Sequence, residues 1–267
     1  MTNPYSDRPL LSKLDGFRIE VDAEAERGDI VLERAPMNVI SMDQRDQLRA
    51  AFEALDADDA VRVIVLRAEG EHFSSGGYIH GFLDASPEHV SQLADNVAAP
   101  WRCAKPVIAA NKGYTFGVGF EISLACDFRI AAKSTFYALP EQKLGQIPGS
   151  GGSARLQALI GLARTKDVVM RSRRISGQQA FDWGIAVELV EDDKLEEATA
   201  RLVNELRSFS PMAQRTAKKL LNDSENATVA TGIELEGHCY SRLRQSEDFA
   251  EGVKAFHEKR KPTFVGR

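Results

Sequence analysis

Cysteine is scarce in this sequence. Only three occur in 267 residues, Cys103, Cys126 and Cys239. Their number and separation fit neither a disulfide framework nor the ligand spacing of a metal site. We therefore expect free, mostly buried thiols, no bound metal and a reducing, cytoplasmic location.

Long apolar runs and an excess of positive charge are missing as well. No segment approaches the ~18 consecutive apolar residues of a membrane span, and no apolar N-terminal segment precedes a small-residue cleavage site. The 34 Lys and Arg residues are outnumbered by 39 Asp and Glu, so the net charge is −5. A nucleic-acid-binding protein would normally show a basic face or stripe. We expect neither a membrane nor a nucleic-acid partner, although a local basic cluster could still hold an anionic ligand.

Glycine is plentiful, but neither a dinucleotide fingerprint nor a P-loop is present. Three glycine-rich segments occur instead, at 73–79, 113–121 and 140–152. The second opens an apolar helix, where free backbone N–H groups and the positive helix end suit an anion or a developing oxyanion. Glu121 lies in the first turns of that helix. Read alone, it either satisfies the helix dipole or faces a cleft.

The hydrophobic pattern predicts an α/β protein, because short β-rich runs are separated by helix-length segments. Ser41 and Ser210 are expected to cap helices, the second with Pro211 at its first position. A sheet-bearing core is followed, without a break in composition, by a helical C-terminal part. Strands are expected over 17–20, 29–33 (a hairpin with the first), 61–66, 106–110, 127–131 and 187–190, and helices over 42–55, 88–98, 194–207, 211–221 and 229–243.

Four motifs occur in a family-specific order. Phe73–Ile79 matches F-x-A-G-A-D-[LI], and 111–121 matches N-G-x-x-x-G-G-G-x-E with Lys112 as one extra residue after the Asn. Residues 140–152 match P-E-x-x-L-G-x-x-P-G-x-G-G, and 246–262 match S-x-D-x-x-E-G followed by A-F-x-E-K-R-x-P. Over nearly its whole length the chain thus resembles the crotonase (enoyl-CoA hydratase/isomerase) superfamily.

This resemblance implies the crotonase (ClpP-like) spiral, an α/β fold of repeated ββα units. Residues 1–200 would form the core that holds an acyl-CoA site. Residues 201–267 would form a C-terminal helical region for trimerisation and CoA contact, in a homotrimer or in a homohexamer built as a dimer of trimers. No cofactor is implied besides the CoA that arrives as part of the acyl-CoA substrate.

The resemblance also implies a set of site residues. The backbone N–H groups of Gly77 and Val118 would form an oxyanion hole for the thioester carbonyl. Val118 replaces a usual glycine, which matters little for an N–H donor. The carboxylates of Glu121 and Glu141 would be catalytic. Contacts to substrate and CoA would come from Arg34, Met37, Ser75, Tyr78, Ile79, Phe256 and Lys259.

Several positions depart from the family pattern. Tyr78 stands where an Asp is common, and His80 where a Lys is often found. Ala35 lacks a basic side chain common in that stretch, although Arg34 is adjacent. These changes affect the expected adenine and phosphate contacts but not the glutamates. For His80, packing or a CoA contact is favoured over catalysis.

Retention of both carboxylates favours a 2-enoyl-CoA hydratase, since two acids can flank one attacking water. The segments 73–78 and 139–152 resemble those of methylthioacryloyl-CoA hydratases, which implies hydration followed by thioester hydrolysis. The alternatives are a general short-chain enoyl-CoA hydratase, an isomerase or acyl-CoA hydrolase of the superfamily, and a non-enzymatic RNA-binding member. The negative charge argues against the last. A short acyl chain is expected from the bulky apolar residues Tyr78, Ile79, Phe82, Leu83, Phe116, Phe120 and Trp101.

Overall fold

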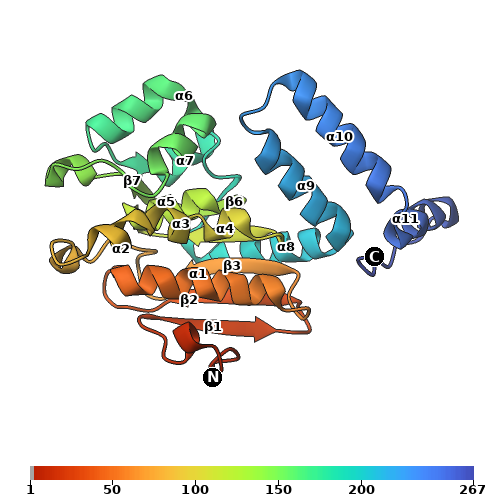
Figure 1. Cartoon of the computed structure of the whole chain (residues 1–267), viewed down its shortest axis with the longest axis horizontal. Coiled ribbons are helices and arrows are strands. Elements are labelled where there is room, and N and C mark those ends of the chain that lie inside the picture. The colour runs from red at the N-terminus through yellow and green to blue at the C-terminus, as the bar shows by residue number, and fades with distance from the viewer. Residues whose placement is uncertain (1–2) are drawn as a thin grey trace.

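The computed structural model describes residues 3–267 and contains two β-sheets surrounded by helices (Figure 1). The strands are β1 (Phe17–Asp22), β2 (Arg27–Leu32), β3 (Val63–Ala68), β4 (Val107–Asn111), β5 (Tyr114–Phe116), β6 (Phe128–Ala132), β7 (Phe136–Ala138), β8 (Ile175–Ser176) and β9 (Glu188–Val190). The α-helices are α1 (Met42–Ala57), α2 (Pro87–Ser91), α3 (Leu93–Val97), α4 (Ala99–Arg102), α5 (Val118–Ala125), α6 (Gly152–Met170), α7 (Gly177–Asp182), α8 (Leu195–Arg207), α9 (Pro211–Ser224), α10 (Val229–Leu243) and α11 (Glu247–Glu258). Single 3₁₀ turns lie at η1 (Pro9–Leu11), η2 (Ile79–Gly81), η3 (Glu141–Leu144) and η4 (Asp192–Lys194).

The larger sheet has the strand order β1-β2-β3-β4-β6-β9. β1 and β2 form the expected antiparallel hairpin, and the remaining neighbours are parallel. Side chains alternate across a strand, so Ile64 and Leu66 pack in the cluster formed with α1. Val63 and Val65 pack on the other face with α8. The predicted α/β class is confirmed, and each predicted strand is present with its ends shifted by at most two residues.

A smaller sheet, β5-β7-β8, was not predicted from the sequence. β5 and β7 are parallel, and β7 and β8 are antiparallel. These strands have two or three residues each, too few for an alternating pattern to be recognised. A single parallel bridge between Ser74 and Thr115 joins the segment before Gly77 to β5. This sheet therefore positions the glycine-rich segments.

The helical segment predicted around 88–98 is present, but it is interrupted. The segment forms two short helices, α2 and α3, with Gln92 between them. The N–H of Gln92 donates to the carbonyl of His89 at 3.1 Å, three residues back, which tightens the backbone and ends α2. No Gly or Pro marks this break in the sequence. Ser86, which accepts from the N–H of His89, caps α2.

The predicted C-terminal helices are confirmed as α8, α9 and α10. Ser210 caps α9 and Pro211 is its first residue, as expected. The ammonium of Lys218, on the buried side of α9, donates to the carbonyls of Pro100 (2.8 Å) and Lys105 (3.0 Å) and to Asp127 (2.7 Å). α9 is therefore anchored on the core, while α10 and α11 continue along one end of the molecule (Figure 1).

Two other expectations concern the whole chain. The boundary at residue 200/201 stays a prediction. Within the described residues, Cys103, Cys126 and Cys239 are free, and the first two are buried, as expected. None of the helices formed by residues 3–267 is long and apolar enough to cross a membrane.

Candidate active site

Three parallel backbone segments end side by side: the segment 73–76, β5 and β7. Phe116 N–H donates to the carbonyl of Ser74, and Gly117 N–H donates to that of Ala138, each at 2.9 Å. The segment 73–76, β5 and β7 thus lie side by side and point the same way. Residues that follow their carboxyl ends must lie close together. Those residues are Gly77, Val118 and Glu141.

A fourth segment, 37–40, runs along the first of these runs. Ser75 N–H donates to the carbonyl of Met37 at 2.8 Å, and Tyr78 N–H donates to that of Ile40 at 2.9 Å. The predicted CoA contacts Met37, Ser75 and Tyr78 are therefore neighbours. Tyr78 and Ile79 are exposed, at 45% and 53%, so both side chains are accessible to a ligand.

The two glycine loops contact each other where the oxyanion hole is expected. Gly76 and Gly117 have φ values of 114° and 52°, a region that favours glycine. A Cβ atom added to Gly117 would lie 3.6 Å from Cα of Gly76. Within residues 3–267 neither the Gly77 nor the Val118 N–H has a hydrogen-bond acceptor. Both N–H groups predicted to bind the thioester oxygen are thus available.

Glu121 is buried, with 3% of its surface exposed. Its Oε1 accepts hydrogen bonds from the N–H groups of Ser150 (2.7 Å) and Gly152 (3.2 Å), where α6 begins. A side chain at Gly152 would meet Cγ of Glu121 at 2.9 Å, so glycine is needed there. Burial raises the pKa of Glu121, whereas the two N–H bonds and the guanidinium groups of Arg45 and Arg155 favour its ionised form.

Glu141 begins η3, directly after β7 and Pro140. Its Oε1 lies 3.3 Å from the position that a Cβ atom on Gly117 would occupy. Its Oε2 is enclosed and has no hydrogen-bond partner within the described part of the chain. Burial raises the pKa of Glu141 to about 7, and the charge of Glu121 adds to the effect. Two carboxyl groups of different environment therefore lie beside two free N–H donors.

Arg34, a predicted CoA contact, is engaged within the fold. Its Nη2 pairs with Asp15 at 2.5 Å and donates to Gln44 Oε1 at 3.3 Å. Gln44 belongs to the capping box of α1, together with Ser41. Arg34 thus ties the N-terminal segment to α1, and a contact with CoA stays a prediction.

Phe256 and Lys259 are not brought to the glutamates within one chain. They lie on or at the end of α11, which Figure 1 shows at the opposite end of the molecule from α2. Phe256 is 81% exposed and lines a groove of about 450 Å³ with residues of α10 and α11. Their contact with CoA would need the site of a neighbouring copy, and it stays a prediction.

Two of the residues expected in the acyl pocket lie elsewhere. Phe120 is fully buried and packs on the Tyr137 ring at 4.8 Å, because it occupies the core side of α5. Trp101 lines a cavity with Leu221 of α9. Phe82, in contrast, covers the oxyanion loop: its Cζ lies 2.5 Å from the position of a Cβ atom on Gly77.

Sequence reasoning missed Arg45, a buried residue of α1 with 5% of its surface exposed. Its Nη2 lies 3.1 Å from the position of a Cβ atom on Gly77. The negative charge of Glu121 favours the charged form of Arg45. A signal was present in the sequence. Arg45 stands three residues before Leu48 and seven before Phe52, on the apolar stripe of the helix.

One group of side chains could in principle hold a cation. Ligand atoms of Asp43, Asp46 and His89 lie within 4.8 Å of one another. Asp46 already accepts from Asn96 Nδ2 at 2.5 Å and contacts His89 Nε2 at 3.1 Å. These contacts hold α2 and α3 against α1, and we assign the group to packing.

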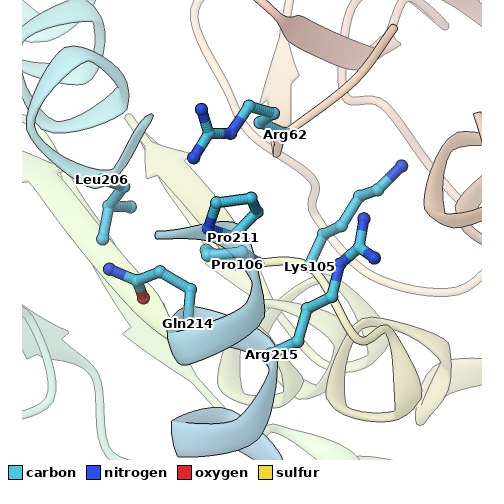
Figure 2. A pocket seen from close by; sticks show the side chains of 7 residues that line it. All are labelled: Arg62, Lys105, Pro106, Leu206, Pro211, Gln214 and Arg215. Atoms are coloured by element: carbon cyan, nitrogen blue, oxygen red, sulfur yellow. The ribbon is translucent and has the colours of Figure 1, made fainter. Parts of the chain in front are cut away.

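A small basic pocket lies where α9 meets the residues just before β4 (Figure 2). Its volume is about 10 Å³, room for a single water molecule at most. The Lys105 ammonium donates to the carbonyls of Leu55 (2.9 Å) and Asp58 (2.6 Å), and Arg62 donates to that of Phe209 (2.5 Å). Because these donors have acceptors, the pocket is a packing feature.

Comparisons with known proteins agree with this arrangement. The family model described as enoyl-CoA hydratase/isomerase matches residues 24–267. A carnitinyl-CoA dehydratase of Salmonella typhi is 35% identical over 251 residues, covering 90% of this chain and 95% of the relative. A probable mitochondrial enoyl-CoA hydratase 2 of Arabidopsis thaliana is 31% identical over 234 residues, covering 86% and 78%. The crystal structure of an enoyl-CoA hydratase from Bacillus anthracis superimposes with a TM-score of 0.89 at 32% identity, covering 95% of this chain and 100% of that one.

Proposed function

The chain belongs to the enoyl-CoA hydratase/isomerase family, and from this premise we propose that it adds water to a short-chain 2-enoyl-CoA thioester. The observation that carries the proposal is the pair Glu121 and Glu141 beside the free N–H groups of Gly77 and Val118. An isomerase needs only one acid to move a proton along the acyl chain. Hydration uses two carboxyl groups, one to accept a proton from water and one to give a proton to C2.

In the proposed reaction the thioester oxygen accepts hydrogen bonds from the N–H groups of Gly77 and Val118. Glu121 takes a proton from water while the hydroxyl oxygen bonds to C3. The electron pair of the double bond moves toward the carbonyl, and the two N–H donors stabilise the resulting enolate oxygen. Glu141 then supplies a proton to C2. A proton then returns from Glu121 to Glu141 through solvent, so the hydration step consumes one water molecule and leaves the thioester intact.

The environments of the two glutamates support these roles. Burial raises the pKa of Glu121 above its ordinary value, but two backbone N–H donors and the charges of two guanidinium groups oppose that rise and favour the carboxylate that a base requires. Glu141 has no guanidinium group among the causes that lower its pKa, and its pKa of about 7 keeps much of it protonated near neutral pH. A group with a pKa near the working pH is well suited to proton transfer.

These roles predict a pH dependence. Glu141 must be protonated to act as the acid, so kcat/KM should fall as pH rises through about 7. Glu121 must be ionised to act as the base, so kcat/KM should also fall on the acid side. The measurement is kcat/KM for crotonyl-CoA against pH, with Glu141→Gln for comparison. A rise of kcat/KM through pH 7 would reverse the two assignments.

The substrate within this class is a further question. The amino-acid sequence of segments 73–78 and 139–152 favours methylthioacryloyl-CoA as the substrate, with subsequent thioester hydrolysis. The alternative is a general hydratase of short-chain enoyl-CoA thioesters. Free CoA and methanethiol from methylthioacryloyl-CoA, with slower hydration of crotonyl-CoA, would favour the specialised enzyme. Fast conversion of crotonyl-CoA to an intact hydroxyacyl-CoA would favour the general one. Mass spectrometry of the CoA products separates the two.

We also propose that the chain assembles as a trimer or as a dimer of trimers. α10 has no buried residue in the single chain, yet Val229, Ile233 and Tyr240 on it are 81%, 65% and 60% exposed. Their spacing of four and seven places them along one stripe of the helix. An apolar stripe of this kind calls for a covering partner.

Sedimentation should therefore give the mass of three or six copies. The variant Ile233→Asp is expected to shift the distribution toward smaller species, because it places a charge on the stripe. Asp223→Asn, an exposed position at the end of α9, is the control. A monomer at micromolar concentration in the wild type would contradict the proposal.

A further inference from the structure

Arg45 is a buried cation on the face of α1 that points into the protein. Its exposed fraction is 5%, and Leu48, Phe52 and Leu55 on the same stripe are at most 1% exposed. The guanidinium group keeps its charge under all ordinary conditions. A side chain of this kind normally occupies the outer face of a helix, so its place needs an explanation.

The guanidinium of Arg45 lacks hydrogen-bond acceptors. Across residues 3–267 it makes no hydrogen bond and no ion pair within 4.0 Å, and its Nε is enclosed without an acceptor. Other buried arginines are fully engaged. Arg129 donates to the carbonyls of Ile185, Ser123 and others. Arg27 pairs with Asp29. Arg45 therefore carries a buried charge whose N–H groups are free to donate hydrogen bonds to a ligand.

The surroundings of Arg45 belong to the proposed active site. Its Nη2 lies beside Gly77, at 3.1 Å from the position of an added Cβ atom. Its Cζ lies 5.7 Å from the centre of the Phe82 ring, which covers the same glycine. The negative charge of Glu121 favours the charged form of the Arg45 guanidinium. That carboxylate directs Oε1 to two backbone N–H groups and forms no ion pair with Arg45.

An unpaired buried charge is costly unless something completes its coordination. A planar guanidinium matches a carboxylate, which it can bind through two parallel hydrogen bonds. The phosphates of CoA are poor candidates, because the whole pantetheine arm separates them from the thioester held at Gly77. The acyl part of the substrate, which continues from the thioester held at Gly77, is therefore the part of the ligand placed to reach Arg45.

We propose that Arg45 is a specificity-determining residue that binds a carboxylate at the far end of a short acyl chain. The substrate class would be 2-enoyl-CoA thioesters of dicarboxylic acids. The chain must be short because Arg45 and the oxyanion donor of Gly77 are adjacent. This inference rests on the proposed function for the position of the thioester, and it proposes an acidic acyl group in place of the uncharged ones of methylthioacryloyl-CoA and crotonyl-CoA. The enzyme would convert glutaconyl-CoA and one water into 3-hydroxyglutaryl-CoA.

The first test measures binding without turnover. Glutaryl-CoA carries the carboxylate, and 5-methylhexanoyl-CoA has a neutral end of the same shape; neither has a double bond to hydrate. Calorimetry on the wild type should show glutaryl-CoA binding about 10–100-fold more tightly, the range expected for a charge-assisted pair. Equal affinities would overturn the proposal. This measurement needs no variant.

The second test removes the cation. Arg45→Met should abolish the preference for glutaryl-CoA and leave the affinity for 5-methylhexanoyl-CoA within about threefold, since only the charge-assisted bonds are lost. Arg49→Met, one turn further along α1 on a more exposed face, is the matched control and should keep the preference. Equal weakening of both ligands by Arg45→Met would show a structural role and refute the assignment.

Turnover separates this inference from the function on which it rests. The wild type should hydrate glutaconyl-CoA with a kcat/KM about 10–100-fold above that for crotonyl-CoA. If crotonyl-CoA is hydrated as well as glutaconyl-CoA, the role of Arg45 fails and the hydratase stands. If glutaryl-CoA binds preferentially but neither enoyl thioester gains water, the hydratase fails and the carboxylate site stands.

Discussion

Glu141→Gln is expected to lower kcat for hydration by about 10²–10⁴-fold, the usual contribution of a positioned acid or base. The amide keeps the shape of the side chain but cannot give a proton to C2. Substrate binding should change little, because the oxyanion donors and the CoA contacts remain. Single-turnover kinetics with crotonyl-CoA and with glutaconyl-CoA would measure the loss.

The same substitution should stabilise the fold. The pKa of Glu141 is raised from 4.5 to about 7 in the folded chain, so ionisation costs stability as pH rises through this interval. Gln carries no such cost. The melting temperature of Glu141→Gln relative to wild type should therefore be higher at about pH 8 than at about pH 5.

Glu24→Gln, an exposed position in the turn between β1 and β2, is the control for both measurements. It should change neither kcat nor the pH dependence of melting. Full hydratase activity in Glu141→Gln would remove the acid from the mechanism and favour an isomerase.

Val118→Pro is expected to lower kcat by about 10²–10³-fold, as the loss of one oxyanion donor does in other enzymes. Proline removes the N–H of this residue. It is tolerated at the first position of a helix, and Val118 is the first residue of α5. The preceding Gly117 has a positive φ and carries no side chain to clash with the ring. The change removes the donor and puts the ring Cδ where its hydrogen was, and it also takes the buried Val118 side chain, 4% exposed, out of the core.

The variant Val118→Ala separates loss of the donor from loss of the side chain. Negative charge develops on the thioester oxygen as the enolate forms, so Val118→Pro should lower kcat, and its ring Cδ should raise KM as well because it points at the same oxygen. Val118→Ala keeps the N–H group and should stay within about threefold of wild type on that argument. Circular dichroism and melting of both variants check the fold. Near-normal kcat in a folded Val118→Pro enzyme would exclude the Val118 N–H from the oxyanion hole.

Much of the fold could be predicted from local patterns. β3 and β4 are buried apolar runs, and α10 begins and ends where the pattern placed it. The sheet β5-β7-β8 could not be predicted, because strands of two or three residues are defined by their partners and not by periodicity. The break at Gln92 also escaped detection, since a local hydrogen bond made it and no helix-breaking residue marks it.

The site was predictable to a different extent. The family resemblance singled out Gly77, Val118 and Glu141, and the structure brings them to the ends of adjacent parallel segments. Phe256 could not be placed, because nothing local in the sequence shows the direction in which α10 carries the chain. Arg45 was overlooked because a charged residue in a helix is ordinarily taken as solvent-facing. Its position on the apolar stripe of α1 indicated that this side chain is buried.

The most direct test of the central claim follows the oxygen of water into the product. The protein is incubated with crotonyl-CoA and glutaconyl-CoA in water enriched in oxygen-18, and the thioesters are analysed by mass spectrometry. The account predicts intact 3-hydroxyacyl-CoA products with one heavy oxygen on the acyl chain, and their loss in Glu141→Gln. Recovery of both thioesters without a gain of water, or of a shifted double bond, would contradict a hydratase.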